Sequence, residues 1–213
     1  MAGKTSMRKK AIIGAALATA LTGNAADNWG KASLYYDTLG FPTATLTGGA
    51  SKLPLGMDFF GFVDFDANEK MNDLQAVYGE FKLSRNVFKN ISLAVEQNQD
   101  FLQLDKGITR AGLMYNIPLD RVCKDSFLSA TYYPFATESD GAQMVIAGRK
   151  EFKKGDMYIE GFLDYNFKPG IAFSQVQVGK RIHKNLYGVL EGRFNGFRLG
   201  NEFSAGIGLE YKF

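Results

Sequence analysis

The sequence is poor in the residues that build catalytic and metal centres. It has one cysteine, Cys123, and one histidine, His183, among 213 residues. A single cysteine cannot form an internal disulfide, and a His/Cys metal site needs several such ligands. His183 falls in an expected turn beside Lys184, where a histidine is more often solvated than a catalytic base. We therefore expect no metal, no cofactor and no enzymatic activity.

Two other patterns are also missing. No glycine-rich segment follows a strand and opens a helix, which excludes nucleotide binding of the Walker or Rossmann kind. Beyond the N-terminal region, no run approaches the roughly 18 apolar residues that a membrane-spanning helix needs. The chain has only 5 prolines but 24 glycines, and 14% of its residues are aromatic.

The N-terminal residues have the pattern of a targeting segment. A basic start is followed by the short apolar run Ala11–Leu21 and then by small residues up to Ala25 and Ala26. The basic residues are Lys4, Arg8, Lys9 and Lys10. This order predicts a signal peptide over residues 1–25, with a buried helix as the alternative. Its removal changes the formal charge from +3 to −1, which argues against a nucleic-acid partner.

The stretch Phe203–Phe213 alternates cleanly between two kinds of side chain. One face carries Phe203, Ala205, Ile207, Leu209, Tyr211 and Phe213, and the other carries Ser204, Gly206, Gly208, Glu210 and Lys212. Period two with one apolar face predicts a strand, and aromatic residues at both ends suit the two interfaces of a membrane. The strand also resembles the closing strand of bacterial outer-membrane barrels. That resemblance implies a partner, the barrel-assembly machinery, which would bind through Phe203–Phe213.

Similar alternation recurs along the rest of the chain. Twelve strands are expected: Lys31–Leu39, Thr43–Ser51, Met57–Asp66, Leu74–Ser84, Ile91–Asn98, Ile108–Ile117, Ser126–Phe135, Gln143–Phe152, Met157–Phe167, Ile171–Ile182, Leu186–Gly196 and Glu202–Phe213. We predict an all-β fold over residues 26–213, a transmembrane antiparallel up-and-down β-barrel of about 12 strands, with ten as the alternative. The first two strands are the hardest to place.

The expected turns suggest an orientation. Four turns carry Lys89, Lys124, Lys154 and Lys184, which are 35, 30 and 30 residues apart. They follow even-numbered strands, so they face the periplasm if the mature chain begins there. The opposite loops, residues 66–73, 100–106 and 138–142, are short for external loops.

Alternation alone does not separate a soluble barrel from a membrane barrel. In a soluble barrel the apolar face points inward, whereas in a membrane barrel it points to lipid. The signal peptide, the Phe terminus and the aromatic strand ends favour the membrane form. We therefore expect the bacterial outer membrane, with membrane lipid around the barrel.

The polar faces of these strands then line the lumen. The candidate solute-lining residues are Asp58, Phe60, Phe62, Asp64, Tyr78, Glu80, Tyr158, Glu160, Phe162, Asp164, Glu191 and Arg193. Aromatic faces stack on sugars or nucleobases, and charged neighbours hydrogen-bond hydroxyl groups. Twelve strands are intermediate between a filled and an open barrel, which suits a small-solute channel. The alternative is an interior filled by structural salt bridges.

Two of these strands resemble a known family. The run Met57–Phe65 and the following run Val77–Ser84 look like the early strands of the Tsx-type nucleoside-specific outer-membrane channels. The matching residues are Asp58, Phe60, Gly61, Phe62, Asp64 and Glu80. The resemblance implies passive uptake of nucleosides through the barrel, without a cofactor.

Three functions follow as hypotheses. The first is an outer-membrane channel for passive uptake of small hydrophilic solutes, with nucleosides as candidates. The second is a closed structural barrel without transport activity. The third is a lipid-modifying barrel enzyme, which needs a serine or an acid at the outer rim paired with a histidine. It is disfavoured because His183 lies on the expected periplasmic side.

Overall fold

The computed structural model describes residues 27–38, 42–68, 71–103, 107–119, 123–137, 141–197, 200 and 202–213. The expected signal peptide, residues 1–25, lies outside the described residues. The described chain forms twelve strands and two short 3-10 turns, so the prediction of twelve strands is confirmed and the alternative of ten is wrong.

The strands follow one another with short connections. They are β1 (Asp27–Asp37), β2 (Pro42–Leu53), β3 (Met57–Ala67), β4 (Leu74–Phe88), β5 (Ile91–Asp100), β6 (Gly107–Asn116), β7 (Ser126–Ala136), β8 (Gln143–Phe152), β9 (Met157–Asn166), β10 (Ile171–His183), β11 (Leu186–Asn195) and β12 (Phe203–Lys212). The 3-10 turns are η1 (Pro54–Gly56), between β2 and β3, and η2 (Lys153–Gly155), between β8 and β9.

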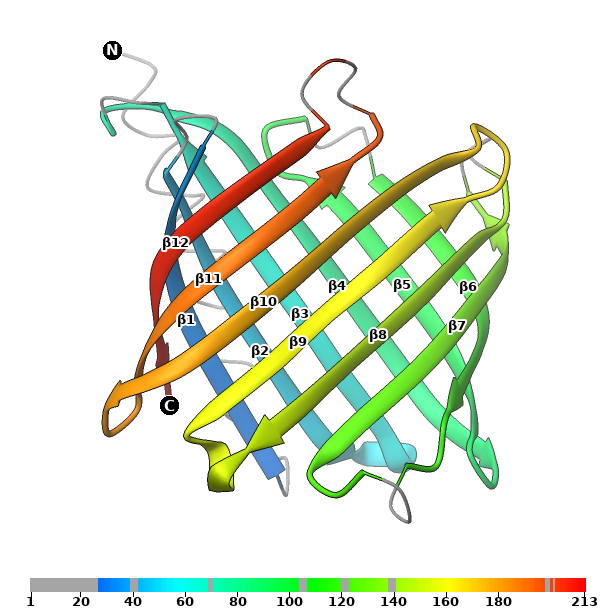
Figure 1. Cartoon of the computed structure of the whole chain (residues 1–213). Helices are drawn as coiled ribbons and strands as arrows, with labels where there is room; N and C mark the ends of the chain where they lie inside the picture. The colour runs from blue at the N-terminus through cyan, green and yellow to red at the C-terminus, as the bar shows by residue number, and fades with distance from the viewer. Residues whose placement is uncertain are drawn as a thin grey trace.

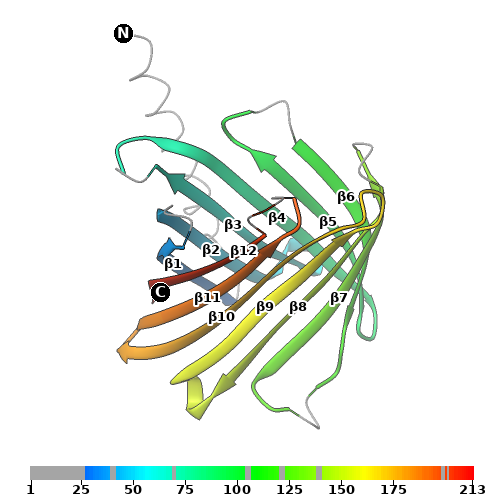
Figure 2. The ribbon, with the colours of Figure 1, turned by 45° about the horizontal axis from the view of Figure 1, so that its top comes forward.

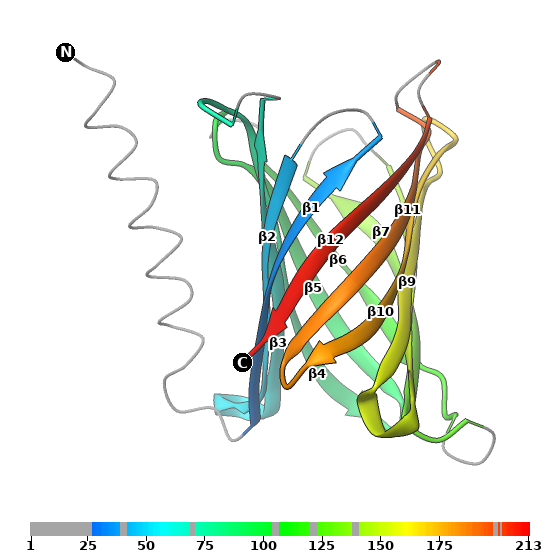
Figure 3. The ribbon, with the colours of Figure 1, turned by 60° about the vertical axis from the view of Figure 1, so that its left-hand side comes forward.

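The sheet is a closed antiparallel barrel. Each strand pairs with its neighbours in the chain, and β1 pairs with β12 to close the ring (Figures 1 and 3). The closure includes two backbone hydrogen bonds at the C-terminus. The Gly30 amide donates to the Phe213 carbonyl at 3.1 Å, and the Phe213 amide donates to the Gly30 carbonyl at 2.9 Å. Closure leaves no edge strand exposed, as a membrane barrel requires.

The outer face of the barrel is apolar. Leu34 of β1, Ile207 of β12 and Leu190 of β11 point outward and are at least half exposed. Outward aromatic side chains gather near both ends of the strands: Tyr36, Tyr132, Phe135 and Phe203 near one end, and Tyr115, Phe152, Tyr211 and Phe213 near the other. An apolar band between two aromatic belts matches the hydrocarbon core and the two interfaces of a bilayer. The described residues include no helix that is long and apolar enough to cross a membrane.

The two ends of the barrel differ in their connections. The turns after even-numbered strands lie together with the C-terminus, and we call this the turn end (bottom of Figure 1). The connections after odd-numbered strands form the loop end. Lys89, Lys154 and Lys184 adopt left-handed backbone conformations in the turns, with φ of 46°, 58° and 42°. Lysine therefore occupies tight positions that glycine or asparagine fills in most turns.

Some expected boundaries were wrong. We expected a turn from Arg85 to Asn90, but β4 continues to Phe88 and only Lys89 and Asn90 form the turn. We also expected His183 in a turn, but it is the last residue of β10 and follows a register shift after Arg181. Both strands extend past the point where alternation weakens, because pairing with β5 and β11 continues there.

Candidate functional site: the inner face of the barrel

Strand register decides which side chains point into the barrel. Paired residues lie on the same face of the sheet, and the face alternates along each strand. All twelve predicted lining residues lie on the inner face: Asp58, Phe60, Phe62 and Asp64 on β3, Tyr78 and Glu80 on β4, Tyr158, Glu160, Phe162 and Asp164 on β9, and Glu191 and Arg193 on β11. Figure 2 shows the barrel with its upper end turned toward the viewer. Contact of these residues with a solute stays a prediction.

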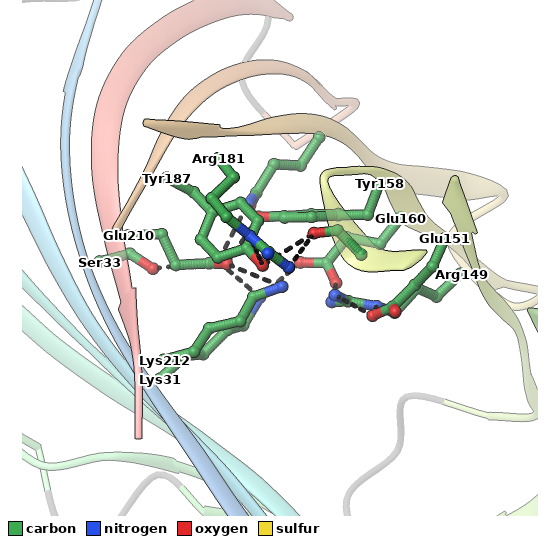
Figure 4. Close-up of polar contacts among 12 residues, drawn as sticks. Lys31, Ser33, Arg149, Glu151, Tyr158, Glu160, Arg181, Tyr187, Glu210 and Lys212 are labelled. Carbon is green, nitrogen blue, oxygen red and sulfur yellow. Dashed lines mark hydrogen bonds and ion pairs between the residues drawn. The ribbon is translucent and has the colours of Figure 1, made fainter. Parts of the chain in front are cut away.

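Glu210 on β12 is at the centre of a polar cluster inside the barrel (Figure 4). Its carboxylate is fully buried and accepts hydrogen bonds from the Tyr158 hydroxyl at 2.8 Å and from the Gln177 amide at 3.1 Å. The Lys31 ammonium lies 3.1 Å from the same carboxylate, and the Lys212 ammonium lies 3.8 Å from it. A buried carboxylate with this many partners holds β1, β9, β10 and β12 together from the inside.

Tyr158 is enclosed by two cations. The Arg149 guanidinium lies 4.2 Å from the centre of the Tyr158 ring, and the Lys212 ammonium also lies 4.2 Å from it. Lys212 contacts the Tyr187 ring as well, at 4.0 Å. Cations over buried aromatic faces are favourable because the ring carries negative charge on its face. This packing orders the lysine and the arginine inside the lumen.

Lys31 crosses the lumen. It starts on β1 and bonds the Glu160 carboxylate on β9, four strands away around the barrel. Glu160 also accepts a bond from Arg149 at 2.5 Å, and Arg149 in turn bonds Glu151 at 2.8 Å. Side chains from β1, β8, β9 and β12 therefore converge in one network (Figure 4).

A second polar cluster lies on the wall formed by β5, β6 and β7. The Tyr133 hydroxyl donates to the Glu96 carboxylate at 2.9 Å, and Arg110 lies 3.6 Å from the same carboxylate. All three side chains are buried. This part of the interior is packed by bonded side chains.

Aromatic rings form a continuous row on another wall. The ring centres of Trp29 and Phe60 are 6.2 Å apart, those of Phe60 and Phe62 are 6.5 Å apart, and those of Phe62 and Tyr78 are 6.0 Å apart. The Lys82 ammonium lies 5.6 Å from the centre of the Phe60 ring. Trp29 can lie along the wall because Gly49 beneath it has no side chain, and a Cβ there would stand 2.5 Å from the indole nitrogen. We call Trp29, Phe60, Phe62 and Tyr78 the aromatic row.

Hydroxyl groups hold the carboxylates of this wall. The Thr45 hydroxyl donates to Asp64 at 2.5 Å, and the Thr43 hydroxyl donates to Asp66 at 2.6 Å. These bonds from β2 orient the two carboxylates of β3. The inner face of β3 therefore carries acids and rings and no base.

Sequence reasoning missed several inner residues that make the cross-strand bonds. Lys31, Tyr35, Tyr133 and Gln177 were not among the predicted lining residues, although the Tyr35 hydroxyl donates to Gln177 at 2.8 Å between β1 and β10. Lys31, Ser33 and Tyr35 alternate with small or apolar residues, a pattern that indicates an inner face on the first strand. These residues were not included because the first strand was the hardest to place.

No group of histidine, cysteine, aspartate or glutamate residues suited to hold a metal ion occurs in the described part of the chain. His183 is exposed at the turn end of β10, and Cys123 lies between β6 and β7. Neither residue belongs to the polar clusters of the lumen.

No protein-family model matches the sequence, and no curated protein matches it. Solved structures do match. The KdgM porin in complex with disordered oligogalacturonate has a TM-score of 0.55 and 14% identity, with 87% of this chain and 99% of that chain covered. A second KdgM porin structure has a TM-score of 0.54 and 14% identity, with 86% of this chain and 99% of that chain covered.

The chain has the fold of these porins. A porin of Rhodopseudomonas blastica carrying three substitutions also matches, with a TM-score of 0.45, 9% identity and coverage of 87% of this chain and 98% of that chain. The closed barrel and its apolar outer face make the protein a porin-like barrel of the bacterial outer membrane.

Proposed function

We propose that the protein is a passive channel for small hydrophilic solutes, and that uncharged nucleosides are its preferred solutes. The aromatic row supports this proposal. Trp29 is 49% exposed and Tyr78 is 37% exposed although both point into the barrel, so the row presents ring surface to the lumen. Stacking on aromatic faces suits nucleobases and sugar rings alike.

The polar side chains beside the row complement the rings. Lys82 pairs in register with Phe60, and Glu80 and Thr47 pair with Phe62 from the two neighbouring strands. A ribose or hexose stacked on the row would find donors and acceptors for its hydroxyl groups there. Five of the residues that resemble the Tsx-type pattern lie on this inner wall, which favours nucleosides as the first solutes to test.

Charge on the same wall disfavours anionic solutes. The inner face of β3 carries Asp58, Asp64 and Asp66 and no base. KdgM is described in complex with oligogalacturonate, a polyanion. Like charges repel in a confined, poorly screened lumen, so we expect this chain to take neutral solutes in preference to such an anion.

Conductance across a planar bilayer tests the proposal. The purified protein is expected to open ion-conducting channels, and added uridine or adenosine is expected to reduce the current in a concentration-dependent way. Maltotriose and trigalacturonate serve as neutral and anionic sugar probes. A protein that inserts in folded form and never conducts would refute the channel function. Stronger block by trigalacturonate than by the neutral probes would refute the solute preference.

A closed structural barrel is the second candidate. It is favoured by the buried cluster around Glu210 and by the Lys31–Glu160 bond, which runs from β1 to β9 through the lumen. Folded protein with no conductance would support this function.

A further inference from the structure

One strand of the barrel differs from all others in the accessibility of its inner face. The inward residues of β3 are Asp58, Phe60, Phe62, Asp64 and Asp66, and each of them is at least partly accessible to solvent. Each of the other eleven strands has at least one inward residue that is buried, such as Tyr133 on β7 and Glu210 on β12. The inner surface along β3 is therefore accessible from the turn end to the loop end.

The interior between β9 and β1 is filled. Side chains there bond one another across two intervening strands, as Tyr35 does with Gln177 and Tyr158 does with Glu210. All four are at most 5% exposed. Packing of this density leaves no space for a solute, because protein interiors contain few voids larger than a water molecule.

Lys31 stands between these two regions. It pairs with Thr47 on β2, and Thr47 pairs with Phe62 on β3, so Lys31 starts two strands from Phe62, while Trp29 of the aromatic row lies on its own strand. Its side chain extends to Glu160 on β9. In the closed barrel of twelve strands β3 and β9 are six strands apart in both directions, so they face each other across the lumen. The Lys31 side chain thus runs from beside the row to the opposite wall.

We infer that solutes pass along β3, off the barrel axis, and that Lys31 is the side chain that limits the width of this path. The inference rests on the proposed channel function. It adds a specificity-determining residue that is not part of the aromatic row. The long Lys31 side chain can swing aside once it leaves its two carboxylate partners, Glu160 and Glu210.

Substitution of Lys31 tests the inference. Lys31→Ala is expected to raise single-channel conductance by about half or more, because the widened lumen moves toward the open barrels of larger strand number. It is also expected to admit larger polyethylene glycols in polymer-exclusion measurements. The matched control is Lys212→Ala. Lys212 is the register partner of Lys31, but its ammonium packs on Tyr158 and Tyr187 inside the filled region. Lys212→Ala should therefore leave unchanged the size of the largest polyethylene glycol that enters the channel.

A second variant covers the case in which Lys31→Ala does not fold. Thr47→Cys, in a Cys123→Ser background, places a thiol in the register row between Lys31 and Phe62. Reaction with a bulky methanethiosulfonate reagent is expected to reduce the current by half or more. The matched control is Ser204→Cys on the inner face of β12, where modification of the thiol should change the current little.

The outcomes separate the inference from the channel function. Suppose that the wild-type protein conducts. If Lys31→Ala then admits no larger polyethylene glycols, or if modification of Thr47→Cys leaves the current unchanged, the proposed path is wrong and the channel function still holds. Silent wild-type protein with a conducting Lys31→Ala variant would refute the channel function and support the role of Lys31. If neither the wild-type protein nor Lys31→Ala conducts, the channel function and the role of Lys31 are both refuted.

Discussion

The Tyr158 hydroxyl on β9 donates a hydrogen bond to the Glu210 carboxylate on β12, 2.8 Å away. The two strands are not neighbours, since β10 and β11 lie between them. Both side chains are almost completely buried, at 1% and 0% exposure. The bond therefore links two separate parts of the curved barrel wall across its concave side.

Loss of the Glu210 charge should destabilise the barrel. In Glu210→Gln the Lys212 ammonium loses its carboxylate partner and Lys31 retains only Glu160. Breaking a buried ion pair costs about 3 kcal/mol or more. Urea unfolding of the barrel in lipid vesicles measures the change, with fluorescence of Trp29, the single tryptophan, as the signal.

Lys52→Met is the control for that variant. Lys52 and Asp27 form an ion pair at the turn end with side chains 71% and 66% exposed. Water and salt screen such an exposed pair, so this substitution should barely move the unfolding midpoint. If Glu210→Gln and Lys52→Met lower the stability of the barrel equally, the buried cluster contributes no more to stability than a surface pair.

Gly179 provides a packing test of the same cluster. A Cβ at Gly179 would overlap the Tyr158 ring and stand 2.7 Å from its hydroxyl oxygen. Gly179→Ala should push Tyr158 away from Glu210 and cost about 1–3 kcal/mol, as overpacking does. The temperature at which the folded band disappears in a heat-modifiability gel measures the loss. Gly192→Ala is the control, because no atom lies within 4 Å of a Cβ there. A Gly179→Ala barrel as stable as Gly192→Ala would contradict the tight packing of Tyr158.

Phe213, the residue that follows β12, should matter more for assembly than Phe203, an exposed aromatic residue at the other end of that strand. Its ring lies over Gly30 where the barrel closes, whereas Phe203 is the first residue of the same strand and also points outward. Phe213→Ala is expected to lower folded protein in the outer-membrane fraction several-fold, and Phe203→Ala to lower it less. Both lose a lipid-facing ring, so the difference between them reports on barrel closure and on the proposed contact with the assembly machinery. Equal levels of the two variants would argue against that contact.

Cys123 can determine which end of the barrel faces the periplasm. It lies at the turn end between β6 and β7. A bulky maleimide added to intact cells should leave Cys123 unmodified and should react after the outer membrane is permeabilised. The control is Cys123→Ser combined with Asp73→Cys at the loop end, which should react in intact cells. The opposite pattern would reverse the orientation.

The rate of the Cys123 reaction should also show a defined pH dependence. The Ser126 hydroxyl beside the thiol lowers the pKa of Cys123 below its ordinary value, with a smaller contribution from Lys150. The thiolate is the reactive form and is populated above the pKa. Half-maximal reactivity of the permeabilised sample should therefore occur at a lower pH than that of an unperturbed thiol. Ser126→Ala should shift the midpoint upward, and an unchanged midpoint would contradict the hydrogen bond.

Much of the architecture could be predicted from alternation alone. The pattern of Phe203–Phe213 predicted which side chains of β12 point to lipid, and the structure confirms it, with Ile207 exposed and Glu210 inside. The twelve strands and the inward position of residues such as Glu160 and Phe62 followed from the same period of two. Alternation is local because successive side chains of a strand point to opposite faces whatever the rest of the chain does.

The interior bonds could not be predicted in this way. Nothing within β1 indicates that Lys31 meets Glu160, because 129 residues separate them and only closure of the ring brings β1 near β9. The same holds for the contrast between the accessible inner face of β3 and the buried residues of β12. Local alternation of side chains sets the strands and the face to which each side chain belongs. The tertiary structure decided which inner side chains bond across the lumen and which stay accessible, because that depends on the curvature and closure of the whole sheet.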